Sequence, residues 1–442
     1  MALLRPHRLR AALLVALVAA GLAAVLFGLL ERSSSPPSAS PPQSGASVGP
    51  LETGAPTPVQ ITALQRSIRV HPRDAELWAA LGSSYYQRVR ETGDFSFYTR
   101  AEGVLNTALR LDPRSSSALV GLATVALARH DFRAGLAYAE RAQRIEPEAN
   151  AAYPGIIDGL VETGRYSAAG RTIQEFLDRI PTLSSYARLS YFRELHGDLD
   201  GALQAMQYAI SAGGAAPENV AYVQTLLGSL EFFRGRLSDA GRADRMALAQ
   251  VPGYPQALVY LGEVQAAEGH LETAIATYRD AVNRLPLPQY VTELGEAELA
   301  AGKPGQAQQD FALIGAEERL LAANGVNTDV DLALFEANHG SPARAVLLGR
   351  RSWTEAPSVR SADARGWALT QADRPAEGLG WARRALMLGS RDPNFLYHAG
   401  IAAARSGDRT AARRYLTAAV SLNPRFSPLY GPRAERALKA LR

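Results

Sequence analysis

The sequence predicts an all-α solenoid of about ten stacked helix pairs, and three observations support this fold class. Prolines recur every 34 residues, at Pro113, Pro147 and Pro181 and again at Pro252 and Pro286. Aromatic residues make up only 7% of the chain, while Ala and Leu dominate, a composition that suits helices packed through small contacts. A chain of 442 residues exceeds what one ordinary core needs, so an array that grows in one dimension accommodates it.

Residues 1–10 form a basic flank that we expect in the cytoplasm. Arg5, Arg8 and Arg10 lie in this flank without any acidic residue, whereas Glu31 and Arg32 cancel on the other side of the apolar segment that follows. The positive-inside bias therefore keeps the N-terminus in the cytoplasm and places the body outside it.

Residues 11–30 are twenty consecutive apolar residues. As a helix they extend about 30 Å, enough to cross the core of a bilayer, so we predict a single transmembrane signal anchor. A cleaved signal peptide is the alternative, since Ala19, Ala20 and Gly21 are small, although such apolar regions usually run about 7 to 15 residues. The protein is membrane-bound in the first case and secreted in the second, with its body extracytoplasmic in both.

Residues 31–58 are rich in Ser and Pro, with almost no large apolar side chain. Such a segment cannot bury enough surface to fold. We expect a disordered linker that separates the body from the lipid.

The segment 59–442 carries the repeat, with a lead-in helix near residues 60–70 and a closing helix near 432–441 acting as terminal capping helices. The clearest unit consists of Trp78, Leu81, Gly82, Tyr85, Ala101, Leu105, Ala108 and Pro113. The glycine after the leucine lets the first helix approach the second closely, and the proline stops the second helix. This unit resembles the tetratricopeptide-repeat family. Together with the apolar segment 11–30, it leads us to expect a membrane-anchored bacterial member of that family.

The resemblance implies a right-handed superhelix whose first helices line a concave groove for protein or peptide partners. When the inward-facing positions of the family's first helices are transferred to this sequence, they give the candidate groove residues Tyr86, Tyr191, Glu194, Tyr222, Phe232, Phe233, Glu263, Glu296, Asp363, Trp367 and Tyr397. Aromatic residues flanked by acids would suit a peptide with apolar anchors and basic residues.

The first repeat holds about seven extra residues around Arg90 to Tyr98. One interpretation is an overlong first helix followed by a surface loop. The other is a contact loop that presents Phe95, Phe97 and Tyr98 to a partner, since exposed aromatic residues are costly without one. The period is also broken between Phe311 and Asp331, where the second helix lengthens.

Several kinds of chemistry are excluded. The chain has no cysteine, so it has no thiolate metal site or cysteine nucleophile. It also lacks a Gly-rich phosphate-binding loop, the G-x-S-x-G motif of many hydrolases and the H-E-x-x-H motif of zinc enzymes. We therefore expect no cofactor and no enzymatic activity. The net charge is +4, most of it in the first 32 residues, which argues against nucleic acid as a partner. The turn histidines His130, His196, His270 and His339 are expected to be ordinary turn residues.

Two functions follow from these observations. The first is a membrane-tethered scaffold whose extracytoplasmic groove binds a protein or peptide of the cell envelope. The second is an extracytoplasmic carrier that holds a small molecule or glycan inside the superhelix, for which an enclosed pocket would be the distinguishing feature.

Overall fold

The computed structural model describes residues 56–213 and 217–441, in which every regular element is helical. The basic flank 1–10, the apolar segment 11–30 and nearly all of the linker 31–58 lie outside these ranges, so their predicted roles stay predictions. Over the two described ranges, no helix is both long enough and apolar enough to cross a membrane.

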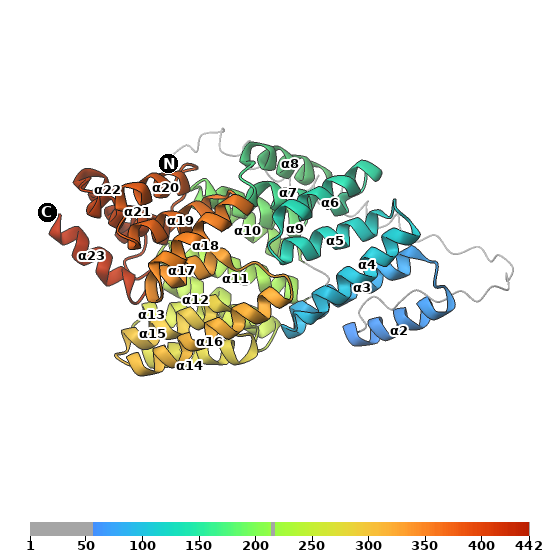
Figure 1. Ribbon diagram of the computed structural model, residues 1–442, viewed down its shortest axis with the longest axis horizontal. Coiled ribbons are helices and arrows are strands. Elements are labelled where there is room, and N and C mark those ends of the chain that lie inside the picture. Colours follow the sequence, from blue (N-terminus) through green and yellow to red (C-terminus); the bar gives the residue numbers. More distant parts are fainter. Residues whose placement is uncertain (1–55, 214–216, 442) are drawn as a thin grey trace, which may run out of the picture. The chain divides into compact units, whose positions relative to one another are not determined.

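Twenty-two α-helices are described, which are a lead-in helix, ten pairs and a closing helix, as the sequence predicts (Figure 1). Their bounds in chain order are α2 Thr57–Val70, α3 Ala75–Thr92, α4 Ser96–Leu111, α5 Ser116–Ala128, α6 Phe132–Ile145, α7 Tyr153–Glu162, α8 Tyr166–Arg179, α9 Leu183–Leu195, α10 Leu199–Ala212, α11 Pro217–Phe233, α12 Leu237–Gln250, α13 Pro255–Ala267, α14 Leu271–Arg284, α15 Pro288–Ala300, α16 Pro304–Ala323, α17 Asp329–His339, α18 Pro342–Glu355, α19 Val359–Gln371, α20 Pro375–Ala385, α21 Pro393–Arg405, α22 Arg409–Leu422 and α23 Tyr430–Ala440.

Small residues let the helices of a pair approach each other. A β-carbon at Gly82 would lie 2.4 Å from Cγ of Leu105, so only glycine fits between α3 and α4. On the second helix, Ala101 and Ala108 are fully buried, one turn on either side of that leucine. The Gly and Ala positions that defined the repeat in the sequence are therefore the positions of closest helix contact.

Aspartates fix where many of the helices begin. Asp131, Asp198 and Asp408 each precede a second helix, and each carboxylate accepts a hydrogen bond from a backbone N–H in the first turn. This capping satisfies donors that have no partner within the helix. The short turn between the two helices of a pair is thereby held in one conformation.

The predicted contact loop of the first pair is wrong, and the overlong first helix is right. Helix α3 continues to Thr92, and α4 begins at Ser96. Tyr98 is buried, and its ring lies 6.4 Å from that of Tyr86. Phe95 and Phe97 are half-buried in the same cluster. These aromatic side chains gain more by packing on α3 than by remaining exposed.

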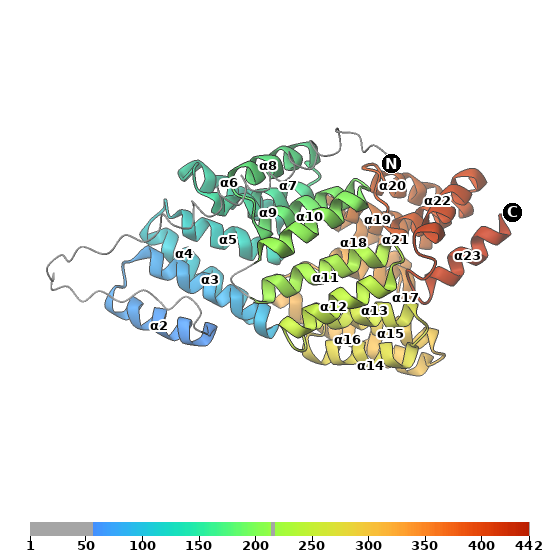
Figure 2. The same ribbon diagram turned by 180° about the vertical axis from the view of Figure 1, so that it is seen from behind.

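The stack of pairs coils back so that distant segments touch. Val359 N donates a hydrogen bond to the Tyr166 hydroxyl 193 residues earlier, at 2.7 Å. Asn423 Nδ2 donates to the Phe232 carbonyl across 191 residues. Figures 1 and 2 show the orange helices α18 and α19 beside the green α7 to α10. These separations correspond to roughly five to six repeats of 34 residues.

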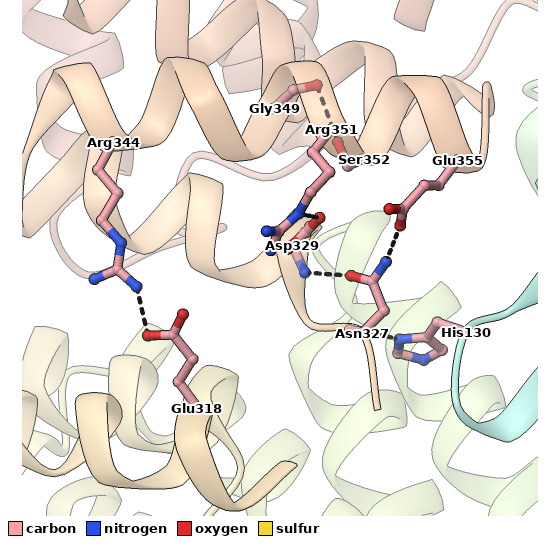
Figure 3. Close-up of polar contacts among 9 residues, drawn as sticks. All are labelled: His130, Glu318, Asn327, Asp329, Arg344, Gly349, Arg351, Ser352 and Glu355. Atoms are coloured by element: carbon pink, nitrogen blue, oxygen red, sulfur yellow. Dashed lines mark hydrogen bonds and ion pairs between the residues drawn. The ribbon is translucent and has the colours of Figure 1, made fainter. Parts of the chain in front are cut away.

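The loop between α16 and α17 forms one such contact, which Figure 3 shows in detail. His130 Nδ1 lies 2.6 Å from the Asn327 carbonyl, 197 residues away, and Asn327 N donates to the Arg129 carbonyl at 2.9 Å. The Asn327 side chain also donates to Glu355 at the end of α18. We call these contacts between segments about 190 to 200 residues apart the seam.

Candidate functional site

A cavity of about 490 Å³, partly open to solvent, lies between the helices that the seam brings together. It is lined mainly by the first helices of successive pairs, α5, α7, α9, α11 and α13, and by α17 and α19 from beyond the seam. A second cavity of about 270 Å³ adjoins it, since Leu127, Asp158 and Arg188 line both. Segments from beyond the seam therefore line part of the concave face predicted from the sequence.

Four of the predicted groove residues line these cavities. Tyr191, Glu194 and Tyr222 line the larger one, and Tyr86 lines the smaller one. Tyr222 keeps 39% of its surface accessible, yet burial raises its pKa. Both statements hold because protein surrounds the side chain while its open surface faces the cavity. Glu263 is half-buried and lies close enough to the cavity residue Tyr260 to raise the pKa of that phenol.

Five other predicted groove residues are in the packed interior, so their assignment to the groove is wrong. Their exposed fractions are at most 5%, and they are Phe232, Glu296, Asp363, Trp367 and Tyr397. Phe233 is half-buried against the same cluster as Phe232. A peptide could contact the five only by separating helices, because each is covered by a neighbouring pair or by the closing helix.

The polar members of this buried group are satisfied by neighbouring pairs. Glu296 accepts a hydrogen bond from the Tyr430 hydroxyl at 2.7 Å and lies 2.8 Å from His339 Nε2. Asp363 lies 2.9 Å from His398 Nδ1. These contacts join α15 to α17 and α23, and α19 to α21, and they stabilise the stack.

The cavity walls hold an excess of acidic groups. Carboxylates come from Asp158, Glu162, Glu194, Asp331 and Glu355, against the guanidinium groups of Arg188 and Arg360. The two arginines already have anionic neighbours. Arg188 donates a hydrogen bond to Asp158 at 2.6 Å. The charges of Glu162 and Asp331 both raise the pKa of Arg360. Glu162 also accepts a hydrogen bond from the Tyr191 hydroxyl at 3.1 Å.

The carboxyl group of Glu194 and those of Glu263 and Glu293 have raised pKa values. Burial and the charge of Asp392 raise the pKa of Glu194 to about 8. Burial and Glu296 raise the pKa of Glu293 to about 8. The pKa of Glu263 is raised by burial and then by Glu293, Asp244 and Asp392. These groups hold protons near neutral pH because burial disfavours their charged forms, and the charge of Arg360 offsets this only in part for Glu194.

A cation entering the cavity would therefore meet carboxyl groups able to ionise, beside the tyrosine rings of Tyr191, Tyr222 and Tyr260. Ammonium and guanidinium groups interact favourably with both carboxylates and aromatic faces. Among the described residues, no three His, Asp or Glu side chains are grouped as they would be around a metal ion.

Sequence reasoning missed Arg360, Arg188 and Tyr260. Arg360 is the second residue of α19 and reaches the cavity only because α7 and α9 lie opposite it across the seam. No local pattern indicates such a contact. Tyr260 could have been found, since it lies on the first helix α13, one turn before the predicted residue Glu263.

Comparisons with known proteins agree with the repeat seen in the helices. The model of the tetratricopeptide repeat matches residues 93–155 and 225–287. The search of curated proteins found no match.

Several solved structures are similar to this chain. The APC/C hetero-tetramer Cut9–Hcn1 has 15% identity and a TM-score of 0.37, covering 87% of this chain and 72% of that chain. A thermophilic tetratricopeptide-repeat protein of Thermus thermophilus has 18% identity and a TM-score of 0.38, covering 43% of this chain and 98% of that chain. The human IFIT1 dimer with PPP-AAAA has 16% identity and a TM-score of 0.38, covering 82% and 78%.

Proposed function

We propose that this chain, whose residues 93–155 and 225–287 match the tetratricopeptide-repeat model, is a non-catalytic scaffold that binds a basic segment of a partner protein in its cavity. Tetratricopeptide repeats generally mediate interactions between proteins, and stacked repeats provide extended binding surfaces. In this proposal the apolar segment 11–30 tethers the protein to the membrane, and the repeat body lies outside the cytoplasm, where its partner is a protein of the cell envelope.

The observation that supports this proposal is the composition of the cavity wall. Five acidic side chains and two guanidinium groups line it, and the carboxyl groups of Glu194, Glu263 and Glu293 have raised pKa values. The adjoining cavity is lined by Val120, Ala123 and other small apolar residues. A lysine or arginine side chain would compensate the acids, and a neighbouring apolar side chain would fill the second cavity.

A second function is favoured by the size of the site. A cavity of about 490 Å³ is large enough for a small molecule, as a carrier would require. The chemistry of the wall then indicates an organic amine rather than a glycan, since the acids outnumber the other charged groups. We retain this carrier as the alternative.

Binding of defined probes tests the proposal. A fluorescent peptide of alternating Leu and Lys should bind, and the same peptide with Glu in place of Lys should not. Glu194→Gln combined with Glu263→Gln should weaken binding, because a bound cation would let both carboxyl groups ionise. The expected loss is about tenfold for each charge that can no longer form, as about 1.4 kcal/mol each would give. The control is Glu146→Gln with Glu435→Gln, which removes two exposed acids outside the cavity.

Equal binding of the Lys and Glu peptides, or no effect of the cavity substitutions, would contradict a basic ligand. Binding of spermidine with the same response to the two cavity substitutions, but no binding of either peptide, would support the carrier instead.

A further inference from the structure

A second cluster of aromatic and basic residues lies on α18, α19 and α20, outside the cavity. The rings of Trp353 and Trp381 meet edge to face with centroids 4.8 Å apart. The guanidinium of Arg384 lies 5.1 and 5.3 Å from the two ring centroids, and that of Arg365 lies 4.0 Å from Trp381. Arg350 lies one turn before Trp353 on α18. We call Arg350, Trp353, Arg365, Trp381 and Arg384 together the Trp–Arg patch.

The arginines of this patch lack anionic partners. Within residues 56–213 and 217–441, no hydrogen bond or ion pair joins the guanidinium of Arg350, Arg365 or Arg384 to an acid. Burial and the charges of Arg350, Arg374 and Arg384 lower the pKa of Arg365, and the charge of Glu377 offsets this only in part. Three like charges beside two indole rings therefore repel one another, and an anion placed over them would relieve that repulsion.

Apolar side chains extend the patch at both edges. Leu347 lies one turn before Arg350 and is 53% exposed, and Met387 follows Arg384 by one turn and is 65% exposed. The described cavities are lined by none of the patch residues. The patch therefore offers charge, indole rings and apolar side chains on a surface outside these cavities.

We propose that the Trp–Arg patch docks onto the surface of a bilayer that contains anionic phospholipids. Arginines attract the lipid phosphates, indole rings prefer the interface between headgroups and acyl chains, and the exposed Leu and Met enter the apolar boundary. The inference does not depend on what the cavity binds, nor on whether residues 11–30 remain as an anchor.

Tryptophan fluorescence of the full chain on lipid vesicles tests this docking. Vesicles of phosphatidylcholine, with or without phosphatidylglycerol, would carry a lipid with a quencher near its headgroup. The chain has four tryptophans, so Trp353→Phe with Trp381→Phe measures the background from the other two. We expect quenching of the patch with phosphatidylglycerol only, and its loss as rising salt screens the charges.

The variant Arg350→Gln with Arg384→Gln should lower the ratio of docked to undocked protein about thirtyfold, as about fivefold per charge implies. The control is Arg171→Gln with Arg319→Gln, which removes two exposed arginines on α8 and α16 and should leave quenching unchanged. Binding through the predicted anchor, residues 11–30, is measured separately by flotation with phosphatidylcholine vesicles. A failure of the anchor prediction can therefore be distinguished from a failure of the patch to dock.

Three results would overturn the inference. The first is equal quenching with and without phosphatidylglycerol. The second is quenching unaffected by the patch substitutions. The third is a fluorescence response to soluble polyglutamate with none to anionic vesicles, which would assign the patch to an acidic protein partner.

Discussion

Replacing Gly197 with alanine should open the seam. Gly197 has a φ of +76° and ends the turn between α9 and α10. A β-carbon there would lie 2.2 Å from the carbonyl oxygen of Gly389, which belongs to the loop before α21. Because this neighbour is backbone, relief requires the two segments to move apart.

The magnitude follows from two contributions. A β-carbon in the left-handed region costs about 1 to 2 kcal/mol, and forcing an extra carbon into a packed contact costs about 1 to 3 kcal/mol more. Gly302 allows the two contributions to be measured separately, because its φ is +75° but nothing lies within 4 Å of an added β-carbon. Gly302→Ala should therefore lose only the first contribution.

The assay is urea unfolding of both variants beside the wild type, with hydrogen exchange measured in the loop around Gly389. We expect Gly197→Ala to be less stable than Gly302→Ala by about 1 to 3 kcal/mol, with faster exchange in that loop. Equal stability of the two variants and unchanged exchange would refute the claim that the seam is a close-packed contact.

Three other predictions concern single side chains. Burial in the fold raises the pKa of Glu194 to about 8, so its contribution to stability is present below about pH 4.5 and is lost as pH rises towards 8. Glu194→Gln should therefore be more stable than the wild type by about 3 to 5 kcal/mol at pH 8.5 and equal to it at pH 4, by thermal unfolding at each pH. Tyr430→Phe leaves the buried Glu296 without its 2.7 Å donor, and should cost about 1 to 3 kcal/mol in urea unfolding. Asn423→Ala removes the hydrogen bond to the Phe232 carbonyl, and should cost about 1 to 2 kcal/mol and speed hydrogen exchange at the start of α12.

The fold could be predicted because its signals are local. Each pair is marked by a glycine that admits the second helix, such as Gly82 against Leu105, and by a proline after the second helix. These residues act within about 34 residues of one another. Even the lengthened α16 and the turn that follows it were visible as a break in the period.

The site could be predicted only in part, because the cavity depends on contacts about 190 residues apart. Of the residues that the resemblance to the family placed in a groove, Tyr191, Glu194 and Tyr222 line the cavity. The resemblance failed for Trp367, whose ring stacks on His398 at 4.2 Å and is only 2% exposed. Whether an inward side chain meets solvent or the next helix depends on how each pair rotates against its neighbour, which the repeat pattern does not specify.

The most direct test of the central claim is photo-crosslinking inside the cavity. A photoreactive amino acid at Tyr222, which faces the cavity, would be compared with the same amino acid at Tyr208, which lies on the second helix α10 and is 49% exposed. In the full-length protein in its own host, position 222 should capture one dominant protein through a Lys- or Arg-rich segment, and position 208 should not. The same diffuse products from both positions, in a folded and correctly located protein, would contradict the claim that the cavity binds a partner protein.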